Sequence, residues 1–155
     1  MHMLKCLALA VALAFGFTVA NAETLSGYAR VVDGDTLKIG DDYVRLYGID
    51  APEKAQACGE WLPGPEAAAA LSAFIAGREV ACEKRDTDRY GRTVATCMAG
   101  GDDLGALMVG AGWAWAFTRY SNTYEPRESE ARAAGLGVHG KGCETPWVSR
   151  ARQRR

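Results

Sequence analysis

The sequence has few of the residues that bind transition metals, and it has no excess of positive charge. Of its two histidines only His139 lies beyond residue 22, and no two cysteines have the C-x-x-C spacing of a zinc site. The 155 residues contain 18 Lys and Arg against 19 Asp and Glu, a formal net charge of -1. Because tight binders of duplex DNA usually carry a strong basic excess, the composition argues against a zinc protein and, more weakly, against such a binder.

One apolar run lies near the start of the chain, and no second run of membrane-spanning length follows it. It extends from Cys6 to Ala20 after Lys5 and ends in the A-x-A sequence Ala20-Asn21-Ala22. This arrangement is typical of a secretory signal peptide, and the run is shorter than the roughly 20 residues of a membrane span. We therefore predict a signal peptide over residues 1–22, cleavage before Glu23, export to the periplasm or the extracellular space, and no membrane association afterwards. An uncleaved membrane anchor is the alternative.

Four cysteines remain beyond residue 22, and an even number in a small exported domain is typical of disulfides. Cys82 and Cys97 flank a predicted hairpin and could face each other across it, which would leave Cys58 with Cys143. We predict these two disulfides, although four cysteines allow two further pairings.

Short segments of strand-forming residues alternate with turn sequences. We predict strands over residues 27–32, 36–39, 43–47, 79–84 and 93–98, and helices over 65–76, 104–109 and 125–134. Several short strands followed by peripheral helices favour a small five-stranded β-barrel of the oligonucleotide-binding (OB) type, with another small α+β sheet as the alternative. Residues 148–155 contain four arginines and are predicted to be a solvated, disordered basic tail, or one that weakly steers nucleic acid.

Acidic residues cluster at two of the predicted strand ends. Asp33 and Asp35 are two positions apart, so both carboxylates can reach one cation if that segment is extended, although Asp-Gly-Asp is also an ordinary turn. Asp50 and Glu53 follow the strand that contains Arg45. Four acids near one edge would repel one another unless a cation or arginines lay between them. Oxygen ligands without histidine or thiolate favour calcium or magnesium.

Two arginines lie in segments close to these acids. Arg45 stands between Val44 and Leu46, so it points away from their side of the strand, toward a cleft or toward a surface ion pair with Asp41 or Asp42. Arg92 follows a Tyr-Gly turn and could equally be an ordinary hairpin residue. Two guanidinium groups from different segments could together bind a phosphate through paired hydrogen bonds.

Three of these segments occur in the order of a known family signature. They are Asp33-Gly34-Asp35-Thr36, Arg45-Leu46-Tyr47-Gly48-Ile49-Asp50-Ala51-Pro52-Glu53 and Asp88-Arg89-Tyr90-Gly91-Arg92. Together they resemble the signature of the thermonuclease, or staphylococcal-nuclease-like, family, and the similarity covers most of residues 25–147. The resemblance implies an α+β, mainly β fold, with a nuclease domain over residues 23–147 built on a five-stranded OB-fold barrel and about three peripheral helices.

The resemblance also implies a division of roles within a calcium-dependent endonuclease. Asp35, Asp50 and the backbone carbonyl of Ala51 would bind Ca²⁺ directly, with Asp33 and Glu53 in contact mainly through water. Glu53 would be the general base, and Arg45 and Arg92 would hold the scissile phosphate. Arg89 and Tyr90 would lie near a terminal phosphate, and Tyr120 would flank a base. The implied reaction is cleavage of the P–O5′ bond in DNA and RNA, preferably single-stranded, leaving 3′-phosphate ends, and we expect a monomer.

Two other functions are compatible with parts of this pattern. A non-catalytic OB-fold module could keep the barrel and bind nucleic acid without cleaving it. The presence of all the acids and arginines named above argues against this alternative. A glycosidase could use Asp35 and Glu53 as a carboxylate pair, yet two neighbouring arginines suit phosphate better than a neutral sugar. Trp113, Trp115 and Phe117 alternate as in a buried extended segment, so we predict core packing for them, and a turn position for His139.

Overall fold

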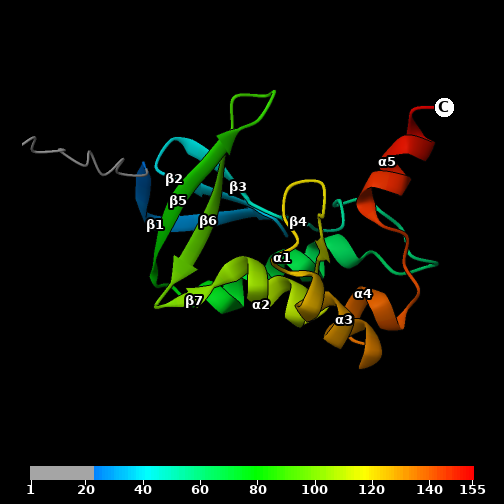
Figure 1. The fold of residues 1–155 in the computed structure, drawn as a ribbon. Helices are drawn as coiled ribbons and strands as arrows, with labels where there is room; N and C mark the ends of the chain where they lie inside the picture. The colour runs from blue at the N-terminus through cyan, green and yellow to red at the C-terminus, as the bar shows by residue number, and fades with distance from the viewer. Residues whose placement is uncertain (1–22) are drawn as a thin grey trace, which may run out of the picture.

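Five strands form a closed barrel in the computed structural model, which describes residues 23–155 (Figure 1). They are β1 (Thr24–Asp33), β2 (Thr36–Ile39), β3 (Asp42–Leu46), β5 (Glu79–Thr87) and β6 (Thr93–Ala99). Neighbours in the order β3-β2-β1-β5-β6 are antiparallel, and a parallel pairing of β3 with β6, in which Val44 lies opposite Thr93, closes the sheet. The predicted OB-type barrel is confirmed. The predicted signal peptide lies outside the described residues.

Local sequence explains where these strands turn. The Asp33 carboxylate accepts a hydrogen bond from the Asp35 backbone N–H at 3.1 Å, which closes the turn between β1 and β2. Gly40 has a φ of 59° in the turn between β2 and β3, a conformation that a glycine adopts without steric cost. Both turns lie at barrel ends, so the first of them delivers Asp35 to the same end as the residues that follow β3.

The remaining strands are short. β4 (Ile49–Asp50) pairs with β8 (Trp115–Ala116), and β7 (Asp102–Asp103) extends the sheet beside β6. The β4–β8 pairing places Asp50 opposite Trp115 and so fixes the segment that carries the predicted acids.

The described residues contain five helices rather than about three. The three predicted helices are present as α1 (Pro63–Ile75), α2 (Leu104–Gly110) and α3 (Glu125–Ala133), followed by a single turn, α4 (Gly137–Gly140), and by α5 (Pro146–Gln153). Helix α1 starts two residues earlier than predicted because Pro63, not Pro65, stands at its first position. None of the helices in residues 23–155 has the length and apolar character needed to cross a membrane.

The prediction of a disordered basic tail is wrong for most of residues 148–155. Pro146 occupies a first-turn position of α5, where its missing N–H costs nothing, and Ser149 is buried against the rest of the domain. The ion pair of Arg150 with Asp50 then fixes the helix to the end of the barrel, whereas Arg152 pairs with Glu144 just before the helix. Figure 1 shows α5 standing apart from α1 to α4, which lie together below it in this view.

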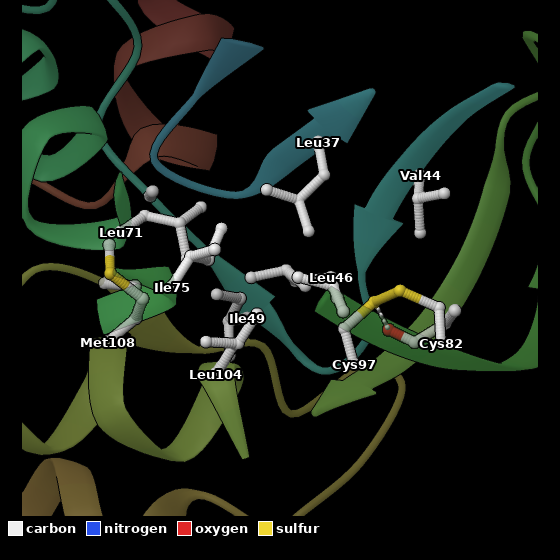
Figure 2. Close-up of a cluster of buried hydrophobic side chains, with 14 of the residues drawn as sticks. Leu37, Val44, Leu46, Ile49, Leu71, Ile75, Cys82, Cys97, Leu104 and Met108 are labelled. Atoms are coloured by element: carbon white, nitrogen blue, oxygen red, sulfur yellow. Dashed lines mark hydrogen bonds between the residues drawn. A yellow bond between two sulfur atoms is a disulfide. The ribbon is translucent and has the colours of Figure 1, made fainter. Parts of the chain in front are cut away.

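The hydrophobic core lies between the barrel and helices α1 and α2. Leu37, Val44, Leu71, Leu104 and Met108 are fully buried there and point toward one another (Figure 2). Residues of the sheet and of both helices are buried in this one cluster, which joins the barrel to α1 and α2. Charged residues at the end of β3 and in the segment after it line a cleft instead.

Both predicted disulfides are present. Cys82 and Cys97 lie directly opposite each other on β5 and β6 inside the barrel, and Cys58 is bonded to Cys143 across 85 positions of the sequence. The second bond ties the loop after β4 to the segment that leads into α5.

The aromatic residues after α2 are buried to different extents. Trp115 is 1% exposed, as predicted for core packing, whereas Trp113 and Phe117 are only partly buried. The ring of His139 lies edge-on to Trp115 at 5.7 Å between centroids, and both of its ring nitrogens are buried without a hydrogen-bond partner. His139 is thus part of α4 and packs against the core instead of lying in an open turn.

Candidate functional site

A cleft of about 1020 Å³ opens between the end of β3, the β5–β6 loop, the segment after β8 and helix α5. All ten residues predicted for the site line it: Asp33, Asp35, Arg45, Asp50, Ala51, Glu53, Arg89, Tyr90, Arg92 and Tyr120. The fold therefore brings together four segments that are up to 87 positions apart, between Asp33 and Tyr120. The placement of Glu53 depends on α1, because the Glu53 carbonyl lies against Gly64 so closely that a Cβ there would stand 2.4 Å from it.

Arg45 joins two buried carboxylates. Its Nη1 lies 3.0 Å from Asp35 Oδ1 and its Nη2 lies 2.8 Å from Asp50 Oδ1, while the two aspartates are 4% and 1% exposed. Val44 and Leu46 point into the core, so Arg45 points into the cleft, and the alternative of a surface ion pair with Asp41 or Asp42 is wrong.

The two aspartates differ in their remaining contacts. Asp35 Oδ2 accepts a hydrogen bond from the backbone N–H of Ala51 at 2.8 Å, and its Oδ1 also accepts one from the Thr36 hydroxyl. Burial raises the pKa of Asp35 to about 6, against the opposing effect of Arg45, and the charge of Asp33 adds to the rise. Burial also raises the pKa of Asp50. A further positive charge close to Asp35 and Asp50 would therefore stabilise their ionised forms.

A second arginine that the sequence analysis did not assign to the site supplies part of that charge. Nη2 of Arg150 lies 2.5 Å from Asp50 Oδ2, and Nη1 lies 2.6 Å from Glu53 Oε1. Burial disfavours the charged form of Arg150, but the hydrogen bond and charge of Asp50 outweigh it and raise its pKa. The sequence feature that could have indicated this role is Pro146, because proline is common in the first turn of a helix. A helix that begins there can present Arg150 to the barrel.

The cleft offers oxygen atoms of the type that a hard cation binds. Within residues 23–155 no group of three or more acidic, histidine or cysteine side chains is arranged as a ready metal site. However, Asp35, Asp50 and the Ala51 carbonyl offer oxygen atoms only, as calcium prefers. A cation already bridges Asp50 and Glu53 in the form of the Arg150 guanidinium. A calcium ion bound to Asp50 would therefore take over part of the contact that Arg150 makes.

The β5–β6 loop brings Arg92 to the other side of the cleft. Asp88 Oδ2 lies 2.7 Å from Arg92 Nε, and Asp88 Oδ1 accepts hydrogen bonds from the backbone N–H groups of Tyr90 and Arg92. Burial tends to raise the pKa of Asp88, but the Arg92 side chain and the two backbone donors together lower it. The Arg89 guanidinium stacks 5.0 Å from the centroid of the Tyr90 ring, and no acidic side chain of the described region pairs with it.

Comparison with known proteins identifies the family. The family model described as "Staphylococcal nuclease homologue" matches residues 43–139, which is more than half of the chain. The chain belongs to the staphylococcal nuclease family. It is 31% identical over 147 residues to an "Uncharacterized endonuclease" of Escherichia coli O157:H7, with 90% of this chain and 93% of the relative covered.

Two further relatives of this nuclease family carry different names. A "Micrococcal nuclease" of Shigella flexneri is 33% identical over 136 residues, covering 76% of this chain and 75% of the relative. The "Succinoglycan biosynthesis protein ExoI" of Rhizobium meliloti (strain 1021) is 38% identical over 125 residues, covering 76% of this chain and 65% of the relative. The chain thus spans slightly less than two thirds of the ExoI protein.

Aromatic residues form one wall of the cleft in this family member. Tyr120 is 57% exposed, its ring lies 5.2 Å from that of Phe117, and its backbone carbonyl accepts a hydrogen bond from the Tyr47 hydroxyl at 2.6 Å. Trp147 of α5 lies on the other side of Phe117 at 5.5 Å between ring centroids. The sequence analysis expected Tyr120 here but did not assign Phe117 or Trp147 to the cleft.

Proposed function

We propose that this nuclease-family chain is an exported, calcium-dependent endonuclease that hydrolyses DNA and RNA, favours single strands and leaves 3′-phosphate ends. The observation that carries the proposal is the pairing of Arg45 with two buried carboxylates beside Glu53. The names of the endonuclease and micrococcal nuclease relatives support the reaction class. The two disulfides support export, because such bonds persist in oxidising compartments.

In the proposed reaction Glu53 removes a proton from the attacking water. Its Oε1 is held by Arg150, whereas its Oε2 accepts no hydrogen bond from residues 23–155 and the side chain is 47% exposed, so Oε2 can reach a water molecule. The water oxygen forms a bond to phosphorus while the P–O5′ bond breaks, and the leaving 5′ oxygen takes a proton from the solvent.

The arginines would stabilise the charge that builds on the phosphate during attack. Arg45 and Arg92 both line the cleft. Arg92 is bonded to Asp88 through Nε and could offer paired hydrogen bonds from its Nη groups, whereas Arg45 already donates from both Nη groups to Asp35 and Asp50 and would bind phosphate through its remaining N–H groups. Asp35, Asp50 and the Ala51 carbonyl would hold the calcium ion, with Asp33 and Glu53 in contact through water. Bound calcium would withdraw electron density from the phosphate and neutralise part of its charge.

The test is cleavage of heat-denatured DNA by the purified protein, with calcium or with a chelator. We expect cleavage only with calcium, and products whose 3′ ends lose phosphate on treatment with a phosphatase. Absence of calcium-dependent cleavage would contradict the proposed function. Binding of the DNA without any cleavage, unaffected by the chelator, would instead support a non-catalytic OB-fold module.

A further inference from the structure

One face of helix α5 lines the cleft. Trp147, Arg150, Ala151 and Arg154 all border it, and their spacing of i, i+3, i+4 and i+7 places them on the same side of the helix. Arg152 belongs to another face and pairs with Glu144 instead. The family model matches residues 43–139, so α5 lies outside the matched segment.

Several contacts fix α5 in this position. Arg150 pairs with Asp50 and Glu53 at one side of the cleft. The Cys58–Cys143 disulfide holds the segment just before the helix, and the buried side chain of Gln56 donates a hydrogen bond to the Glu144 carbonyl at 2.8 Å. The helix is therefore a structural wall of the cleft, and its cleft-facing side chains have defined positions.

Two of those side chains are available to a ligand. Trp147 remains 37% exposed beside Phe117, and the exposed Arg154 guanidinium has neither an ion-pair nor a hydrogen-bond partner among residues 23–155. Seven residues separate them, which corresponds to about 10 Å along the helix axis. An exposed aromatic ring can stack on an unpaired base, and an unpaired guanidinium can bind a backbone phosphate.

We propose that α5 is a second nucleic-acid-binding element, which holds single-stranded polynucleotide next to the scissile phosphate. Trp147 stacks on a base, Arg154 binds a phosphate, and Arg150 acts as a positioning residue that anchors the helix to the acids. The ligand class follows from the charge of the helix face and from its aromatic ring, and the inference rests on the proposed nuclease function. Double-stranded nucleic acid keeps its bases stacked on each other and so cannot use Trp147.

The test measures binding of fluorescein-labelled oligothymidylate of twelve nucleotides by anisotropy, with calcium present and in a Glu53→Gln background that slows turnover. Arg150 keeps its ion pair with Asp50 in this background. Trp147→Ala should weaken binding about 5- to 160-fold, the range expected for the loss of one stacked base. Arg154→Ala should reduce the slope of log K against log salt by about 0.7, the value for one phosphate on a single strand. The matched control is Arg152→Ala, on another face of the same helix, which should change neither the affinity for the oligonucleotide nor the salt slope.

Kinetics with an otherwise unmodified protein separate this inference from the proposed function. Trp147→Ala and Arg154→Ala should raise KM for denatured DNA by a much larger factor than they change kcat, because neither side chain is among the groups proposed for the reaction. Trp147→Phe keeps a ring and should restore most of the binding. Arg154 has no hydrogen-bond or ion-pair partner among residues 23–155, so its loss removes no such interaction from the fold. If the parent protein cleaves DNA but both variants bind and cleave as it does, the inference is wrong. If the parent cleaves nothing, the proposed function is wrong.

Discussion

Replacement of Arg45 by methionine should destabilise the protein strongly, because it removes the cation between two buried carboxylates. Loss of one partner from a buried ion pair typically costs about 3–5 kcal/mol of unfolding free energy. Arg150 still compensates Asp50 in the variant, whereas Asp35 keeps only the Ala51 N–H and the Thr36 hydroxyl. We therefore expect the lower end of this range, about 3 kcal/mol, which is a large part of the 5–15 kcal/mol that stabilises a typical domain.

Urea denaturation in the presence of a chelator, followed by tryptophan fluorescence, measures this loss. Arg85→Met is a matched control, since Arg85 pairs with Glu83 at the surface with both side chains more than 40% exposed, and such pairs contribute about 0–1 kcal/mol. Adding Asp35→Asn to Arg45→Met should recover part of the stability, because the uncompensated charge is then gone. A loss for Arg45→Met no greater than that for Arg85→Met would refute the reasoning.

Three other changes test separate parts of the structure. Cys58→Ala with Cys143→Ala opens a loop of 85 positions and should lower the unfolding free energy by about 4–5 kcal/mol in urea titrations; a loss below about 1 kcal/mol would contradict the pairing. Burial lowers the pKa of His139, so the unfolded chain binds the proton more readily and the contribution of His139 to stability falls as the pH drops below about 6.5. The raised pKa of Asp35 acts in the opposite direction, so the test is the difference between variant and parent: His139→Phe should raise the melting temperature at pH 5 relative to pH 7, and an unchanged profile would exclude a contribution from His139. Gly64→Ala puts a Cβ 2.4 Å from the Glu53 carbonyl and should reduce kcat for DNA cleavage while the fold persists, whereas wild-type kcat would show that the loop adapts freely.

Local patterns in the sequence were sufficient to predict the strands and the hairpin disulfide, whereas the choice of an OB-type barrel over another small sheet came from the family resemblance. Short strands bounded by glycine and aspartate turns are recognisable without tertiary information, and Cys82 and Cys97 lie at matching distances from the β5–β6 loop. The prediction of α1 was off by two residues because either of two prolines could begin it, and only packing against the Glu53 loop selects Pro63.

The part of the site formed by α5 could not be predicted from local patterns. Four arginines near a chain end are typical of a solvated segment, and a helix of eight residues has little stability of its own. What stabilises α5 is the contact of Arg150 with Asp50, across 100 positions of the sequence, together with the Cys58–Cys143 bond. Interactions of such long range become visible only once the fold is known.

The predicted residues of the cleft were found together because their motifs lie at strand ends that the barrel brings to one side. Their contacts were less predictable. The sequence suggested that arginines or a cation would lie among the acids, but it did not reveal that Arg45 bonds both Asp35 and Asp50. Nor did it reveal that Arg92 is held by Asp88.

The rate of DNA cleavage by Glu53→Gln tests the central claim most directly. The measurement is single-turnover cleavage of denatured DNA with calcium, alongside oligothymidylate binding, with Glu79→Gln, an exposed carboxylate on β5, as the control. If Glu53 is the general base, its variant should bind normally and cleave about 10²- to 10⁴-fold more slowly, while the control cleaves at the parent rate. Cleavage by Glu53→Gln at the parent rate would contradict the account.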